Sequence, residues 1–558
     1  MESFFLSKKL CQTSIQKLLE SGANVLRNEV EFDILMSELF IWRKLMLSKV
    51  LSFGLNGIDG FAIEIESDIV GGLPHFDIVG LGDTAVKEAK ERVKSAIRNS
   101  GYEYPAKHYT INLAPADLKK EGPQFDLGIA VGILSASEQI TIKKYKDFVF
   151  LGELSLDGSI KRVRGVLPIL ISALKNGLKK IILPKENAEE ARFIKGLEIY
   201  AFGHLREVVD FLQEEDSSKY KPVEAKSFED VKVAISNKLD FENVKGQKVA
   251  KRALEIAAAG GHNVIMVGPP GSGKSMLAKC FSGILPDLTF EEALEVTKIH
   301  SVAGVLDLSA GIITERPFRT PHHTATTISL TGGGSHSKPG EISLAHNGVL
   351  YLDEFPEYSR QLIETLRQPL EDGTITVARA NQTVTYPSSF TLIASMNPCP
   401  CGNYGAKDRE CKCSPVQIHK YLAKISGPIM DRIDIQVEVD NIAYSDLHTK
   451  EKEECSADIK KRVDGAREIQ LKRFEGTKTF SNAKMSVAQT KKFCTLSSDC
   501  QTLMEQAFST LKLSARAHDR ILRVARTIAD LEGESEILPQ HLAEAISYRG
   551  LDRKYWSV

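Results

Sequence analysis

The pattern of apolar and polar positions changes along the 558-residue chain. Residues 62–66 (AIEIE) alternate with a period of two, which predicts a half-buried strand. Residues 83–100 (DTAVKEAKERVKSAIRNS) have apolar positions at helical spacing and end before a glycine, which predicts a helix. Further strands are predicted at 148–151 and 180–184, around a helix at 167–176. This mixture is typical of an α/β or α+β domain.

Changes in composition divide the chain into five parts. Residues 46–213 hold the first domain, and 214–230 are polar, charged and interrupted by a proline, as in a linker. A second α/β domain is expected over 231–440, and 441–558 are helical and rich in charge. Residues 1–45 precede the strand-like start of the first domain. They are interpreted as an N-terminal extension, either from an upstream start codon or as a helical or functional arm.

Bulk composition excludes some classes of protein. The net charge is −1, so any nucleic-acid contact has to come from local basic patches. The sequence has no run of about 18 apolar residues and no secretory signal pattern at its start, so we expect a cytoplasmic protein with no membrane partner. Cysteines in that compartment stay reduced, and a cluster of them indicates metal binding rather than disulfides.

A phosphate-binding loop follows a predicted buried strand at 263–267 (NVIMV). The loop GPPGSGKS precedes a predicted helix, which is the strand–loop–helix context that this motif requires. We expect Lys274 to reach the β- and γ-phosphates of ATP and Ser275 to ligate Mg²⁺. The candidate cofactor-binding residues are Gly268, Pro269, Pro270, Gly271, Ser272, Gly273, Lys274, Ser275 and Met276.

Two further strands end in polar residues suited to the same site. The strand predicted at 348–352 is followed by Asp353 and Glu354, and the strand predicted at 390–395 ends just before Asn397. Ligands of α/β sheets bind at the carboxyl ends of the strands. We expect Asp353 to hold Mg²⁺ and Glu354 to polarise the attacking water. We expect Asn397 to contact the γ-phosphate and that water; a plain strand cap is the alternative.

Together these segments resemble an AAA+ ATPase. Residues 240–247 (DFENVKGQ) resemble the box on the adenine side. Residues 426–434 (SGPIMDRID) are similar to the segment with the arginine finger, which makes Arg432 the candidate that acts on a neighbouring subunit's ATP. Residues 514–531 resemble the lid helix with the second sensor, for which Arg516 is the first candidate and Arg520 the second.

The whole pattern resembles the magnesium-chelatase-like AAA+ proteins of bacteria, the ComM/YifB group, from residue 46 to the C-terminus. The resemblance implies an α/β multidomain fold. Its parts would be a Lon-protease-like N-terminal domain of the ribosomal S5 domain 2 type, an AAA+ P-loop ATPase core and a helical C-terminal lid. It also implies ATP and Mg²⁺ as cofactors, a homo-oligomer, expected to be a hexamer, and a role in DNA branch migration during recombination of transforming DNA.

The Lon-like part departs from the protease at its catalytic pair. The loop KKEGPQ (119–124) resembles the protease's nucleophile loop but has Gln124 at the serine position. Gly165-Val166-Leu167 replaces the segment that carries the protease's lysine. The missing pair argues against proteolysis and favours ring assembly or DNA contact. Its basic residues either face DNA or are solvated surface: Lys119, Lys120, Lys161, Arg162 and Arg164.

Two segments of the core are candidates for DNA contact. Residues 373–387 predict a hairpin with Arg379 at its tip, which the family resemblance places at the ring's pore; a solvated hairpin is the alternative. Residues 299–334 match the position of a helix-2 insert, made locally basic by Arg316, Arg319, His322 and His323. The paired histidines favour DNA over metal, because they lack acidic or cysteine partners in the sequence.

Four of the nine cysteines fall within fifteen residues, as two Cys-x-Cys pairs: Cys399, Cys401, Cys411 and Cys413. Four thiolates in a reduced compartment suit a structural Zn²⁺, which would stabilise a loop rich in proline and glycine. Free thiols are the alternative. Metal catalysis is disfavoured, because four thiolates leave no open coordination position.

The leading hypothesis is an ATP-driven ring motor that acts on single-stranded or branched DNA. The alternative is a protein-remodelling or magnesium-chelatase-type motor without a DNA role, although the chain shows no integrin-like metal-binding domain. A DNA-binding scaffold without enzymatic activity is third, and the complete set of catalytic residues argues against it.

Overall fold

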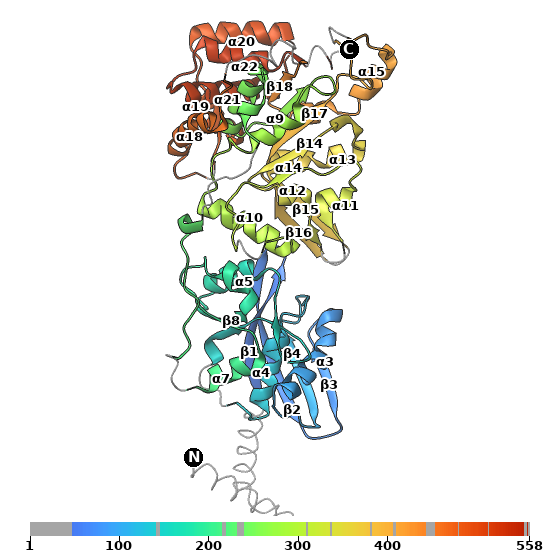
Figure 1. Cartoon of the computed structure of the whole chain (residues 1–558), viewed down its shortest axis with the longest axis vertical. Coiled ribbons are helices and arrows are strands. Elements are labelled where there is room, and N and C mark those ends of the chain that lie inside the picture. Colours follow the sequence, from blue (N-terminus) through green and yellow to red (C-terminus); the bar gives the residue numbers. More distant parts are fainter. Residues whose placement is uncertain are drawn as a thin grey trace, which may run out of the picture.

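The protein is described from a computed structural model. The structure describes residues 47–140, 145–214, 219–231, 239–307, 311–334, 337–379, 382–405, 409–441, 452–477, 479–511, 513–551 and 555. Figure 1 shows an elongated molecule. The N-terminal domain, in blue and teal, lies at one end, and the core, in green to orange, lies at the other beside the red C-terminal helices.

A seven-stranded sheet forms the centre of the N-terminal domain, in the order β3-β4-β2-β1-β5-β8-β9. The pairs β1–β2 and β2–β4 are antiparallel, and the remaining pairs are parallel. The strands are β1 (Ser48–Asn56), β2 (Asp59–Val70), β3 (His75–Val79), β4 (His108–Ala114), β5 (Phe148–Phe150), β8 (Lys180–Pro184) and β9 (Glu198–Phe202). The antiparallel pair β6 (Glu153–Leu154) and β7 (Ile160–Lys161) lies apart from this sheet.

The helices of this domain are α3 (Thr84–Asn99), α4 (Asp126–Ala136), α5 (Val166–Lys175), α6 (Ala188–Ala191) and α7 (Leu205–Gln213). Helix α3 confirms the helix predicted from apolar spacing; the Asp83 side chain caps it by accepting a hydrogen bond of 2.9 Å from Val86 N. Helix α4 was not predicted. All its residues are buried, so its sequence shows no polar face.

The described part of the predicted linker packs on this domain. Val223 N donates to Ile199 O on β9 at 2.7 Å, and Lys226 N donates to Arg192 O at 3.1 Å. Phe228 is 7% exposed. From Lys219 to Asp230, where the structure describes it, the connection is therefore held in place rather than extended in solvent.

A parallel five-stranded sheet forms the core, in the order β11-β14-β17-β10-β18. The strands are β10 (Val264–Val267), β11 (Phe318–Arg319), β14 (Val349–Leu352), β17 (Thr391–Met396) and β18 (Ile435–Glu438). The helices are α8 (Lys248–Gly260), α9 (Lys274–Phe281), α10 (Phe290–Ala303), α11 (Thr327–Thr331), α12 (Glu341–Leu344), α13 (Arg360–Thr365), α14 (Arg367–Asp372), α15 (Pro415–Leu422) and α16 (Gly427–Met430). Because the strands are parallel, their carboxyl ends gather at one edge of the sheet.

The C-terminal helices are α18 (Ser456–Arg473), α19 (Val487–Phe493), α20 (Ser498–Leu511), α21 (Ala515–Glu532) and α22 (Pro539–Ser547). Helices α18 and α21 pack on α8 of the core, and the two parts share one apolar cluster. None of the helices among the described residues is long and apolar enough to cross a membrane.

Strands β15 (Thr374–Arg379) and β16 (Gln382–Pro387) form the predicted hairpin, with register Arg379↔Gln382 at its end. The hairpin lies between the core and the N-terminal domain (Figure 1). It contacts the β1–β2 turn: a Cβ placed at Gly57 would lie 2.5 Å from Val384 Cγ1. Residues 380 and 381, at the tip, lie outside the described residues.

Candidate nucleotide site

The P-loop joins β10 to α9 and lines a cavity of about 370 Å³. Gly271 and Gly273 have φ angles of 82° and 91°, a left-handed conformation that side chains rarely adopt. A Cβ at Gly268 would lie 2.1 Å from Val439 O, so this position also requires glycine. A glycine-rich loop that lines a cavity at the N-terminus of α9 is suited to binding phosphate through its backbone N–H groups.

Lys274 is held at the first turn of α9. Its Nζ donates to Gly268 O at 2.7 Å and Pro269 O at 2.8 Å, and it lies 3.4 Å from Asn397 Oδ1. Burial lowers the pKa of Lys274 to about 8, against the opposing effect of Asp353 and Glu354. The backbone oxygens hold the ammonium group where a nucleotide's phosphates can replace them.

Ser275 and Asp353 meet across the cavity. Ser275 Oγ donates to Asp353 Oδ2 at 2.8 Å, and Ser395 Oγ donates to Asp353 Oδ1. Tyr351 OH donates to Ser275 Oγ at 3.2 Å. Although burial opposes ionisation, the hydrogen bonds from Ser395 and Ser275 lower the pKa of Asp353. An ionised carboxylate beside a hydroxyl is a suitable pair of oxygen ligands for Mg²⁺.

Sequence reasoning missed Tyr351 and Ser395. Both lie on core strands, where their neighbours are apolar: VLYL in β14 and TLIASM in β17. Each is buried, and their hydroxyls hydrogen-bond to each other at 3.0 Å beside Ser275 and Asp353. A polar residue within each apolar strand was the only available signal.

Glu354 follows β14 and begins a turn (Phe355–Glu357). Its φ of 52° is left-handed, which is uncommon for a residue with a side chain and frequent at functional sites. Its side chain is 54% exposed and lines the cavity. The Nδ1 atom of His323, in the predicted insert, lies 3.4 Å from its Oε2.

Arg432 lies at the other edge of the sheet. Asn263, just before β10, donates from Nδ2 to Arg432 O at 3.0 Å, whereas the P-loop follows β10. The four residues of β10 therefore separate Asn263 from the P-loop by about 13 Å, at about 3.3 Å per residue. Arg432 Nη2 forms an ion pair with Glu371, and its side chain is 8% exposed.

The two sensor candidates accompany Arg432 rather than the P-loop. Burial lowers the pKa of Arg432, and the next largest causes are the neighbouring charges of Arg516, Arg367 and Arg520. Arg516 is exposed at the start of α21, whereas Arg520 forms an ion pair with the buried Asp434. Arg516 is thus the more accessible of the two.

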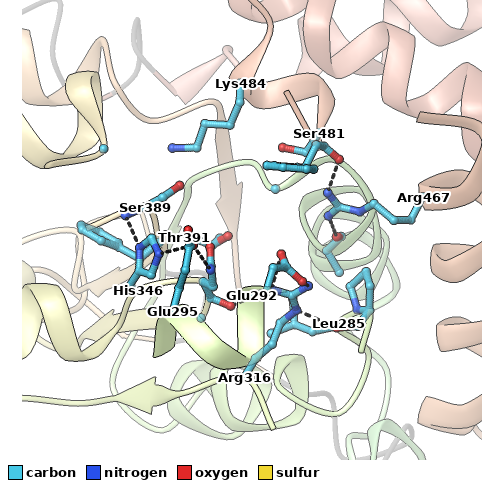
Figure 2. A pocket seen from close by; sticks show the side chains of 18 of the residues that line it. Leu285, Glu292, Glu295, Arg316, His346, Ser389, Thr391, Arg467, Ser481 and Lys484 are labelled. Carbon is cyan, nitrogen blue, oxygen red and sulfur yellow. Dashed lines mark hydrogen bonds and ion pairs between the residues drawn. The ribbon is translucent and has the colours of Figure 1, made fainter. Parts of the chain in front are cut away.

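Arg316 faces a second cavity, of about 350 Å³, between the core and the C-terminal helices (Figure 2). Its guanidinium donates to Glu292 Oε2 at 2.8 Å and to Asn347 O at 2.7 Å. Arg467 and Lys484 reach the same cavity from the opposite side (Figure 2). Arg319 is similarly paired, with Glu341, at 2.6 Å. A DNA contact by Arg316 or Arg319 stays a prediction, and it would require these ion pairs to be exchanged.

The two Cys-x-Cys pairs come together after β17. Cys399 Sγ lies 3.4 Å from Cys401 Sγ, and each lies 3.7 Å from Cys411 Sγ. All four Sγ atoms, that of Cys413 included, lie within 4.8 Å of one another. Thiolates that bind one Zn²⁺ tetrahedrally at about 2.3 Å are about 3.8 Å apart, so this donor set fits zinc. A Cβ at Gly402 would lie 2.4 Å from Pro270 Cδ, which shows that the loop packs on the P-loop.

The Lon-like region retains no nucleophile at the predicted position. Gln124 Nε2 donates to Glu121 O at 2.7 Å. Lys120 is fully buried and donates to Leu118 O at 2.8 Å, so the prediction that it faces DNA or solvent is wrong. Lys119 is about half exposed and pairs with Glu121 at 2.6 Å.

Comparisons with known proteins agree with this geometry. Three family models match: "Magnesium chelatase, subunit ChlI" at residues 240–447, "Subunit ChlI of Mg-chelatase" at 65–187 and "Magnesium chelatase, subunit ChlI C-terminal" at 453–549. The chain is 43% identical over 511 residues to competence protein ComM of Haemophilus influenzae, covering 91% of this chain and 98% of that protein. It is 44% identical over 499 residues to uncharacterized protein YifB of Escherichia coli, covering 89% and 96%. Lon protease 2 of Bacillus subtilis is 32% identical over 137 residues, 24% of each chain.

With the parallel sheet, the P-loop and the acidic pair, these matches define a magnesium-chelatase-like AAA+ protein with a Lon-like part. The chain belongs to the ComM/YifB family.

Proposed function

We propose that the protein is an ATP-hydrolysing ring motor that acts on DNA, in branch migration or unwinding during recombination of incoming DNA. One observation carries the ATPase part: Lys274, Ser275, Asp353, Glu354 and Asn397 line or adjoin one cavity at the carboxyl edge of the sheet. Lys274 would contact the β- and γ-phosphates, and Ser275 and Asp353 would hold Mg²⁺, which neutralises phosphate charge. Glu354 would polarise the attacking water, and Asn397 would orient it against the γ-phosphate.

The position of Arg432 supports a homo-oligomer. It lies at the sheet edge opposite its own P-loop, beside Arg516. A guanidinium that stabilises the transferring phosphoryl group must reach it, so Arg432 would act on the ATP of a neighbouring subunit. We propose that Arg516 joins it there, and that a hexameric ring supplies these interfaces.

Two observations support DNA as the substrate. The hairpin β15–β16 lies at the junction of core and N-terminal domain, with Arg379 ending β15 beside the tip. An arginine beside the tip of a hairpin there suits phosphate contacts without base readout. The relative from H. influenzae is named a competence protein. Arg379 is our first candidate for DNA contact.

The proposed domains are 46–213 for the Lon-like part, 214–230 for the connection, 231–440 for the core and 441–558 for the lid, after an extension over 1–45. Packing of α18 and α21 on α8 supports a helical lid against the core. A structural Zn²⁺ on the four clustered cysteines completes the proposal, and reduced thiols suit a cytoplasmic location.

Steady-state ATPase assays with no DNA, single-stranded DNA, duplex DNA and a four-way junction test this function. We expect DNA to stimulate ATP turnover, and branched DNA to stimulate it most strongly. DNA should stimulate the turnover of Arg379→Ala less than that of the wild type. If none of the DNA substrates changes the turnover, the result would favour the alternative, a protein-remodelling or chelatase-type motor. The names of the matching family models are consistent with that alternative. Absence of any turnover by the assembled protein would refute the proposal.

A further inference from the structure

We propose that Asp434 is a positioning residue for hydrolysis between subunits: it holds Arg520 of the lid on the backbone of Arg432. The inference rests on the proposed function, because Arg432 is the residue proposed to act on a neighbouring subunit's ATP. The observation that carries it is a pair of hydrogen bonds to one buried carboxylate. Asp434 is 4% exposed; its Oδ2 accepts from Asn263 N at 2.9 Å, and its Oδ1 accepts from Arg520 Nη1.

The core sheet supplies the fixed side of this arrangement. Asn263 directly precedes β10, and Asp434 directly precedes β18, which pairs with β10. Asp434 N donates to Asn263 O at 3.0 Å. The Asn263 side chain donates from Nδ2 to Arg432 O at 3.0 Å and accepts at Oδ1 from Leu392 N, in β17, at 2.8 Å. The backbone of Arg432 is therefore attached to the edge where β10, β17 and β18 begin.

The lid supplies the other side. Arg520 Nη1 donates to Asp434 Oδ1 and also to Arg432 O, the latter at 3.2 Å. The carbonyl of Arg432 thus accepts one hydrogen bond from the core and one from α21, which uses both of its lone pairs. Arg516 lies one turn earlier on α21, and residues four apart lie on the same face of a helix. By holding Arg520, Asp434 therefore keeps the start of α21 beside Arg432.

Electrostatics explains why an acid stands at this position. Burial lowers the pKa of Arg432, and three neighbouring guanidinium groups, that of Arg516 first, lower it further, so these cations repel one another. Burial opposes ionisation of Asp434, but the charge of Arg520 is the largest of several effects that lower its pKa. Without this carboxylate, Arg520 would stay largely buried among like charges, which is unfavourable.

The fixed backbone leaves the Arg432 side chain free to change partners. Its guanidinium donates from Nη1 to Pro428 O at 2.6 Å and forms an ion pair with Glu371, whose side chain is 55% exposed. Side-chain rotation can therefore exchange this carboxylate for a neighbour's phosphate. A misplacement of about 1 Å at a reacting group can cost about 100-fold in rate. Loss of Asp434 should thus lower turnover while nucleotide binding to the subunit's own P-loop continues.

The test is steady-state ATPase of the full-length protein, with binding of a fluorescent ATP analogue measured separately. We expect Asp434→Asn to lower kcat by about 10- to 100-fold and to leave analogue affinity within about twofold of the wild type. Arg520→Gln should have the same effect from the lid side. The double variant should lose no more than the larger single loss, because both changes remove one interaction. Asp519→Asn removes a more exposed charge beside Arg520 and should match the wild type.

Mixed rings separate positioning from a loss of fold. A subunit with Asp434→Asn keeps its P-loop, and a subunit with Lys274→Ala keeps an intact Arg432, so mixing the two should restore part of the turnover. Mixing Asp434→Asn with Arg432→Ala should restore none, because no interface then contains a correctly placed Arg432. A subunit that had merely unfolded would restore turnover in neither mixture.

Wild-type kcat in Arg520→Gln, or in Asp434→Asn that circular dichroism shows to be folded, would overturn the inference. If Asp434→Asn does not fold, Arg520→Gln decides alone. A loss of turnover that Lys274→Ala complements in Arg432→Ala but in neither of these variants would also overturn it. In each case the proposed function stands as long as Arg432→Ala has lost turnover. Full turnover in Arg432→Ala would instead refute the proposed action between subunits.

Discussion

Ser275 and Asp353 lie 78 positions apart in the chain and are joined by a 2.8 Å hydrogen bond between Ser275 Oγ and Asp353 Oδ2. The bond forms because β10 and β14 both pair with β17 and run parallel, so the P-loop and the acidic pair leave the sheet at the same edge. Ser395 on β17 completes the arrangement by donating to Asp353. The two oxygen ligands expected for Mg²⁺ therefore lie side by side at this edge of the sheet.

This arrangement predicts that binding and hydrolysis can be separated by mutation. Lys274→Ala should lower ATP affinity by about two orders of magnitude, because it removes the buried cation that faces the phosphates. Glu354→Gln should bind ATP normally while turnover falls by about 10²- to 10⁴-fold, because the amide is a poor base. Equilibrium binding and steady-state turnover measure the two effects. Lys279→Ala, an exposed lysine on the same helix, is the matched control, and full ATPase activity in either site variant would contradict the assignment.

The lowered pKa of Lys274 predicts a pH dependence of nucleotide binding. Burial brings this pKa to about 8, whereas bound phosphates would raise it again. Binding to the protein then takes up a proton above pH 8, so ATP affinity should be constant near pH 7 and fall as the pH rises from about 8 to 9.5, by up to about tenfold per unit. Titration of an ATP analogue across this range, with the fold checked by circular dichroism, measures the effect. Constant affinity up to pH 9.5 would show that Lys274 is not the responsible group.

Local sequence was sufficient to predict the strands and loops that carry the P-loop and the acidic pair. The P-loop and the acidic pair each combine a strand, its end and the chemistry within a few residues, so their element types could be read directly. The helix that begins after Asp83 could also be predicted from local sequence, because its capping residue directly precedes the residues with apolar spacing.

Contacts between distant segments could not be predicted in this way. The carboxylate partners of Arg316 and Arg319 lie 24 and 22 residues away, and their pairing is set by how the insert packs. Helix α4 was missed because its glycines and apolar residues are buried on all sides: a Cβ at Gly128 would lie 2.7 Å from Ile65 Cδ1. The contact of His323 with Glu354 follows from sheet order, which no local pattern contains.

The position of Arg432, away from its own P-loop, leads to a prediction about cooperation between subunits. If Arg432 acts on a neighbour's ATP, Arg432→Ala should keep ATP affinity but lose about 10³-fold or more in turnover. Mixing this variant with Lys274→Ala should restore part of the activity, because some interfaces then combine an intact P-loop with an intact Arg432.

ATPase activity as a function of mixing ratio is the measurement, and Arg360→Ala, an exposed arginine on α13, is the control. Mixtures that never exceed the activity of the separate variants would show that Arg432 does not act between subunits.

The cysteine cluster predicts that zinc supports the nucleotide site without taking part in the chemistry. Purified protein should contain about one equivalent of zinc, because the four Sγ atoms of the cluster lie within 4.8 Å of one another. Removing the metal, or Cys399→Ser together with Cys411→Ser, should lower the Tm and raise KM for ATP by several-fold, with a smaller effect on kcat. The reason is that the loop packs on Pro270 of the P-loop through Gly402, while the thiols do not line the nucleotide cavity. Cys455→Ser, outside the cluster, should retain zinc, Tm and KM. Zinc below about 0.3 equivalents, with all four thiols open to titration, would instead show that the loop folds without metal.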